Sequence, residues 1–122
     1  MAPCDIATVC AYREPDGEMV LSGVEVAASF LKRLRGLLGR DGLAPRGGLL
    51  LAGVNGVHTF GMGFPIDVLF LDRNGTILKV VRAMKPGRVA RAVPGGVSCL
   101  ELASGAAAQH RLEPGTRLRF GS

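Results

Sequence analysis

The stretch "IDVLFLDRNGTILKVVRAM", residues 66–84, decides the fold class of this chain. Residues 66–72 are mostly branched or aromatic, which is typical of a β-strand. The pair Asn74-Gly75 follows, and it favours a tight hairpin turn because such turns need positive φ angles at their centre. Residues 77–84 then predict a second strand, antiparallel to the first. The sequence therefore predicts a β-hairpin at the centre of a β-rich domain.

Further strands and turns are predicted on both sides of this hairpin. The expected strands cover 5–12, 18–27, 49–54, 97–103 and 117–120, and residues 57–62 should be short and extended. Loops and turns are expected at 14–17, 41–48 and 85–96, where Gly and Pro cluster. With 18 Gly and 7 Pro among 122 residues, many turns are favoured over a helical bundle.

Two short helices are expected among the strands. Residues 29–40 place five apolar side chains at three- and four-residue steps, which predicts an amphipathic helix capped by Ser29 and Gly39. A second helix is predicted over 104–112, opened by Ser104. The predicted fold is therefore mainly β (α+β), a small antiparallel β-barrel-like domain with two short helices, because closure of a sheet removes its exposed edges. A strongly curved sheet also fits the pattern.

Length and composition indicate a single globular domain over residues 1–122. A chain of this length can bury one core, and with 5% aromatic residues and no Trp that core should be aliphatic. Cys4, Cys10 and Cys99 form neither a zinc spacing nor an even disulfide framework, which favours a reducing compartment. The first residues lack the pattern of a secretory signal, and no apolar run reaches membrane-spanning length. We therefore expect a cytoplasmic protein.

The net charge of +5 favours acidic partners such as phosphates, nucleic acid or an anionic lipid surface. The near absence of aromatic side chains weighs against nucleic acid, because single strands are bound largely by base stacking. The segment 82–91 has a cation at every third position, namely Arg82, Lys85, Arg88 and Arg91, and no acid lies between Asp72 and Glu101. These four side chains could gather a phosphate or an acidic surface, or they could simply form a solvated loop.

The chain resembles domain-of-unknown-function family 192, a bacterial and archaeal family, from about Val24 to residue 120. The resemblance is carried by "RLRGLLGR" (33–40), "HTFGMGFPIDVLFLDRNG" (58–75), "LELASG" (100–105) and "LEPGTRL" (112–118). It implies a compact β-barrel-like domain with a small helix, and it implies no particular activity. The residues of this chain that match the motif are Arg35, Gly36, His58, Thr59, Phe60, Met62, Pro65, Asp67 and Asp72.

Asp67 stands out because it lies within the apolar strand 66–72, where its carboxylate should be at least partly buried and should need a partner. Arg35, at the edge of the apolar face of the first predicted helix, is the candidate. A structural Arg35–Asp67 ion pair that joins helix to sheet is the favoured interpretation. A polarised carboxylate in a pocket is the alternative.

His58 could act as a general base, a metal ligand or a switch, because its ordinary pKa lies near neutrality. No nucleophile motif accompanies it, so a histidine at the edge of the core is favoured over a catalytic one. His58 and Met62 suit a soft metal such as Cu(I), but two ligands do not make a site, and no metal or cofactor is predicted.

These observations lead to two hypotheses. The first is a binding or interaction module with a shallow polar pocket lined or supported by Arg35, His58, Thr59, Met62 and Asp67, flanked by the basic segment and filled by a small or acidic ligand. The second is a small hydrolase- or lyase-type enzyme in which His58 is the base and Asp67 or Arg35 orients it. The sequence leaves the ligand, the reaction and the oligomeric state open.

Overall fold

A computed structural model describes residues 6–27 and 42–121 of the chain. The strands in these ranges are β1 (Ile6–Glu14), β2 (Glu18–Ala27), β3 (Gly47–Ala52), β4 (Val57–His58), β5 (Ile66–Leu71), β6 (Ile77–Met84), β7 (Val89–Ala90), β8 (Ser98–Ala103) and β9 (Arg117–Gly121). The helix is α2 (Ala106–Gln109). The predicted helix over 29–40, with Ser29, Arg35 and Gly39, lies outside the described residues.

The predicted central hairpin is confirmed, because β5 and β6 pair antiparallel. The side chain of Asp72 shapes the turn between them. Its Oδ1 accepts hydrogen bonds from the backbone N–H groups of Asn74 (2.8 Å) and Thr76 (2.9 Å). Gly75 supplies the positive φ of 82° that the turn requires. The sequence indicated Gly75 for this turn, whereas the part played by the Asp72 side chain is seen only in the structure.

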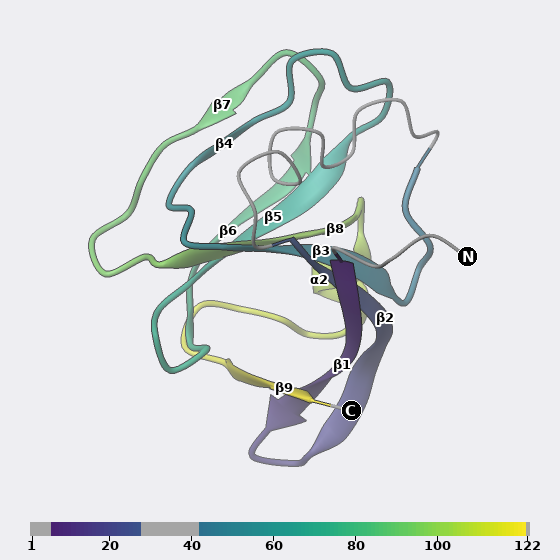
Figure 1. Ribbon diagram of the computed structural model, residues 1–122, viewed down its shortest axis with the longest axis vertical. Coiled ribbons are helices and arrows are strands. Elements are labelled where there is room, and N and C mark those ends of the chain that lie inside the picture. Colours follow the sequence, from purple (N-terminus) through teal and green to yellow (C-terminus); the bar gives the residue numbers. More distant parts are fainter. Residues whose placement is uncertain (1–5, 28–41, 122) are drawn as a thin grey trace.

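Seven strands form one sheet in the order β6-β5-β8-β3-β2-β1-β9, and β4 and β7 form a separate two-stranded sheet (Figure 1). The large sheet departs from the expected antiparallel pattern at one place, where β2 pairs parallel with β3. Parallel neighbours need a long crossover connection, here residues 28–46, which a hairpin turn could not replace. The segment 18–27 forms one strand, with Gly23 inside it.

The predicted closed barrel is not found among the described strands. The sheet order ends at β6 and β9, and these ends meet only at the bridge Thr76–Arg117. The N–H of Leu118 donates to the Gly75 carbonyl at 2.9 Å, and the N–H of Ile77 donates to the Thr116 carbonyl at 2.8 Å. One edge of β9 pairs along its length with β1, and on the other edge its first residue, Arg117, forms the bridge to Thr76. The result is a strongly curved, open sheet.

The strand β5 is buried on both faces and separates two apolar clusters. Leu69 and Leu71 pack on one side with residues of β2, β8, α2 and β9. Val68 and Phe70 pack on the other side, which β3 and β7 also line. Alternate side chains of a strand point to opposite faces, so Asp67 lies on the same face as Leu69, towards α2.

The second predicted helix is shorter than expected. α2 is a single turn, and its N-cap is Gly105 with a φ of 92° rather than Ser104, with no side-chain cap hydrogen bond from its own segment. The carboxylate of Asp67 in β5 takes the place of that cap. No helix within residues 6–27 or 42–121 is long and apolar enough to cross a membrane.

Candidate functional site

Asp67 is 1% exposed, which confirms that the strand buries its carboxylate. Both oxygens accept hydrogen bonds from the backbone. Oδ2 accepts the N–H groups of Gly105 (3.1 Å) and Ala107 (2.9 Å), and Oδ1 accepts the N–H of Ala83 (2.8 Å). A buried carboxylate is stable only when such donors replace water, so this side chain joins the start of α2 to β6. The predicted Arg35–Asp67 pair involves a residue outside the described ranges and stays a prediction.

The Ala83 N–H that donates to Asp67 lies at a β-bulge in β6. The register between β5 and β6 shifts between Ile66 and Val68, and Ala83 has a φ of 48°, which is rare for a residue with a side chain. An extra residue of this kind bends a strand and redirects its side chains. Asp67 therefore holds the bulge that follows Arg82.

Thr59 is also fully buried, and its polar atoms bind one turn of the basic segment. Its hydroxyl donates to the Lys85 carbonyl at 2.7 Å and accepts the Arg88 N–H at 2.9 Å. Its own N–H donates to the Arg88 carbonyl at 2.9 Å. This one side chain fixes the turn 85–88 against the segment 57–62.

His58 lies at the surface beside Phe60. The two rings stack with their centroids 5.1 Å apart, and His58 Nδ1 accepts the Phe60 N–H at 3.3 Å. Met62 is half-buried and packs against the cluster on the β7 side of the sheet. Among the hydrogen bonds of the described residues, none joins His58 to Asp67. One form of the enzyme hypothesis requires Asp67 to orient His58, and the two side chains form no direct hydrogen bond.

A groove of about 820 Å³ runs along β6 and β7. Among the described residues, its lining contains Lys79, Arg82, Lys85, Arg88 and Arg91, with Val80, Val81, Ala83, Met84, Val89 and Ala90 between them, and no acidic residue. All five cations are exposed. The four cations singled out from the sequence thus line one groove. We refer to this feature as the basic groove.

Lys79 belongs to this groove although the sequence interpretation did not include it. A signal was present, because positions 79, 82, 85, 88 and 91 continue the same three-residue spacing. The strand and the loop face each other only after the chain turns at 85–88.

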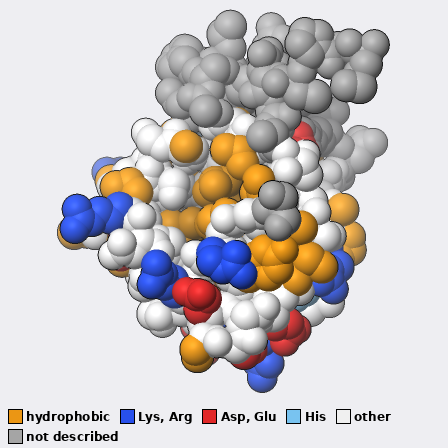
Figure 2. Space-filling model, turned by 60° about the horizontal axis from the view of Figure 1, so that its bottom comes forward, with side chains coloured by type: hydrophobic (Ala, Val, Ile, Leu, Met, Phe, Trp, Pro, Cys, Tyr) orange, Lys and Arg blue, Asp and Glu red, His pale blue; other side chains and the backbone are white. Residues whose placement is uncertain are grey.

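A second charged cluster lies far from the groove, at the β1–β2 hairpin. Arg13 is 7% exposed and donates to Asp16 (2.6 Å), Glu18 (2.9 Å) and the His110 carbonyl (2.6 Å). The hydrogen bond from Arg13 holds the pKa of the Asp16 carboxyl below its ordinary value. In Figure 2 the molecule is turned so that the end with the β1–β2 hairpin comes forward. Acidic side chains lie beside Lys and Arg on this face, so its charges are mixed.

Comparison with known proteins now places the chain. The model of DUF192, described as "Uncharacterized ACR", matches residues 11–120. The chain belongs to the DUF192 family. The match covers the strands β2 to β8 completely and begins before Val24, where the sequence resemblance started. None of the curated proteins compared with this chain matches it.

Two crystal structures share the fold of this DUF192 domain. One, from Sinorhizobium meliloti 1021, is called a "putative transcription regulator"; it is 24% identical, with a TM-score of 0.85 and 98% of each chain covered. The other, a protein of unknown function from Novosphingobium aromaticivorans DSM 12444, is 18% identical with a TM-score of 0.78. That match covers 93% of this chain and 84% of the other. At these identities the likeness establishes the fold alone.

Proposed function

We propose that this DUF192 protein is a non-catalytic binding module for a small or acidic ligand. The ligand carries several negative charges and lies in the basic groove. The observation that carries this proposal is the charge of the lining, which has five cations and no acid within residues 6–27 and 42–121. Neighbouring cations repel one another, and a multivalent anion removes that repulsion while it forms charge-assisted hydrogen bonds. A groove of this volume suits a small molecule.

In this proposal Thr59 and Asp67 are positioning residues. Thr59 fixes the turn that carries Lys85 and Arg88, and Asp67 fixes the bulge beside Arg82. His58 pairs with Val89 of the groove lining, and Met62 packs against the apolar cluster that contains Met84 and Ala90. The predicted role of Arg35 belongs to the same proposal and rests on the sequence alone.

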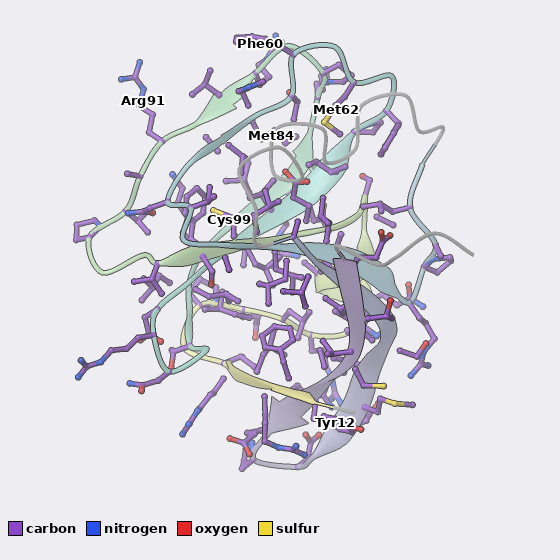
Figure 3. The ribbon with its side chains drawn as sticks, in the orientation of Figure 1. Tyr12, Phe60, Met62, Met84, Arg91 and Cys99 are labelled. Carbon is purple, nitrogen blue, oxygen red and sulfur yellow. The ribbon has the colours of Figure 1, made fainter. Side chains whose placement is uncertain are left out.

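The test is calorimetric titration with inorganic tripolyphosphate at low ionic strength. We expect Arg82→Ala and Arg88→Ala each to weaken binding about tenfold, since one charge-assisted contact contributes roughly 1.5 kcal/mol. The matched control is Arg119→Ala, which removes the same charge from an exposed side chain on β9. Arg119 stacks on Tyr12, and Figure 3 shows Tyr12 and Arg91 near opposite ends of the molecule. This control should change the affinity less than twofold.

Two results would contradict the proposal. One is the absence of any binding of tripolyphosphate by the wild-type chain. The other is an equal loss of affinity in Arg119→Ala and in the groove variants, which would mean that only the net charge of the protein matters.

A further inference from the structure

The turn that follows β4 presents an unusual apolar surface. Phe60 is 53% exposed and Val89 is 57% exposed. His58 connects them, because its ring stacks on Phe60 and its Cα pairs with Val89 across β4 and β7. Figure 3 places Phe60 at one extreme of the long axis of the molecule and Tyr12 near the other. We refer to His58, Phe60 and Val89 as the aromatic tip.

The aromatic tip is held rigidly although it is exposed. The residue between His58 and Phe60 is the buried Thr59, whose hydroxyl and N–H bind the turn 85–88. The Met62 N–H and the Gly87 N–H both donate to the Thr59 carbonyl, at 3.2 and 3.0 Å. Hydrogen bonds therefore hold the backbone beside Phe60 while its ring stays exposed. An aromatic ring that is held in water in this way indicates a site of interaction with another apolar surface, into which the ring can insert.

Cations flank the aromatic tip, and acids are absent from the flanking sequence. Lys85 and Arg88 lie in the turn that Thr59 anchors, and Arg91 follows β7. Segments 42–66 and 73–100 together contain no Asp or Glu. The two carboxylates between them are the buried Asp67 and Asp72, which is engaged in the hairpin turn. This end of the molecule thus combines projecting apolar side chains with positive charge.

We propose that the aromatic tip docks on an anionic lipid surface, with Phe60 and Val89 inserted at the headgroup boundary. Lys85, Arg88 and Arg91 then contact the phosphate groups of the lipids. This inference rests on the proposed anion-binding function, with lipid headgroups as the source of the phosphate. A projecting turn with two apolar side chains enters a soft lipid interface without a preformed pocket, whereas a protein partner would need a cavity of matching shape. Nearby cations add attraction to anionic lipids.

The test is co-sedimentation with vesicles of phosphatidylcholine alone and with phosphatidylglycerol added. The wild-type chain should sediment with the mixed vesicles and stay in solution with phosphatidylcholine alone. The variant Phe60→Ser should bind the mixed vesicles about tenfold more weakly. It should bind tripolyphosphate as the wild type does, because Phe60 is not part of the lining of the basic groove. Its melting curve by circular dichroism should stay cooperative.

The matched control is Met19→Ser/Val97→Ser. These side chains are 40% and 45% exposed and lie away from the tip, since Met19 pairs with Tyr12 and the Val97 N–H binds the Leu71 carbonyl. This variant should sediment like the wild type.

Several outcomes would overturn the inference. Tripolyphosphate binding without sedimentation would remove the lipid inference and leave the proposed function in place. The absence of both would remove the two together. Equal losses in the tip and control variants, or a preference for duplex DNA over vesicles at equal phosphate concentration, would exclude the aromatic tip as a lipid-docking site.

Discussion

At the scale of single residues, Asp67 shows how an acidic side chain can be accommodated inside a strand that is otherwise apolar. Its two oxygens accept three backbone N–H groups, from Ala83, Gly105 and Ala107. Any substitution that converts one oxygen into a donor leaves a buried N–H facing another N–H. The carboxylate is therefore required by hydrogen-bond chemistry as well as by shape.

We expect Asp67→Asn to lower the free energy of unfolding by about 2–3 kcal/mol, because buried hydrogen bonds to a charged group are lost. Asp72→Asn is the matched control. Both backbone bonds of Asp72 go to Oδ1, which an amide oxygen can replace, so its loss should stay below about 1 kcal/mol. Urea unfolding of the three proteins measures the difference, and equal losses would contradict the assigned role of Asp67.

Cys99 carries a second prediction at this scale. Its side chain is fully buried, and this burial raises the pKa of the thiol to about 11 from an ordinary value of 9.0. A pKa that is higher in the folded state means that folding favours the protonated thiol. The stabilising contribution is therefore complete below pH 9.0 and is lost as the pH rises towards about 11.

The measurement is the free energy of unfolding against pH for the wild type and Cys99→Ala. The wild type should lose stability relative to the variant across this alkaline window, while the cost of the cavity in the variant is independent of pH. Parallel curves would show that the thiol stays protonated in both states or ionises equally in both.

At the scale of elements, the β5–β6 turn holds β9 as well as its own strands. The Gly75 carbonyl accepts the Leu118 N–H, and a Cβ at position 75 would collide with the Leu118 carbonyl. Gly17, in the β1–β2 turn, has a similar positive φ of 70° but open space around it. A side chain at position 17 would therefore meet backbone strain alone, whereas one at position 75 would meet backbone strain and a steric clash.

We expect Gly17→Ala to cost about 1 kcal/mol, the ordinary penalty of a left-handed backbone with a side chain. Gly75→Ala should cost about 2 kcal/mol more, because the β9 contact must also shift. Thermal and urea unfolding give both values. Similar losses for the two variants would mean that the contact between the turn and β9 contributes little.

The short helix α2 illustrates why element ends were predicted less well than element interiors. Ser104 precedes a run of alanines, so a local cap was the natural expectation. The donors of this turn are satisfied by Asp67, which is about forty residues away in the sequence. A cap supplied through tertiary contact leaves no local pattern, so only the three-dimensional structure reveals it.

At the scale of the whole molecule, the sheet depends on its last strand. β9 pairs with β1, buries Leu118 and packs Phe120 against the core shared by β2, β5 and β8. A chain that ends at Thr116 should therefore lose cooperative unfolding, while a chain that ends at Gly121 should keep it. Calorimetry distinguishes the two. A cooperative transition in the shorter chain would show that the remaining strands form a stable domain.

The basic groove is also a property of the whole molecule. Four of its five cations could be identified from their spacing, but the spacing did not show that β6 and β7 face each other across a groove. The turn 85–88, fixed by Thr59, brings them together.

The sequence by itself determined most of the strands, the central hairpin, the burial of Asp67 and the row of cations, because alternation, turn residues and charge spacing are local patterns. It did not predict β7, which lies in the expected loop 85–96. The tertiary structure alone decided the parallel pairing of β2 with β3, the open edge between β6 and β9, the backbone partners of Asp67 and the exposure of Phe60. Each of these depends on which distant segments meet, and a sheet joins segments whose separation in the sequence carries no local signal.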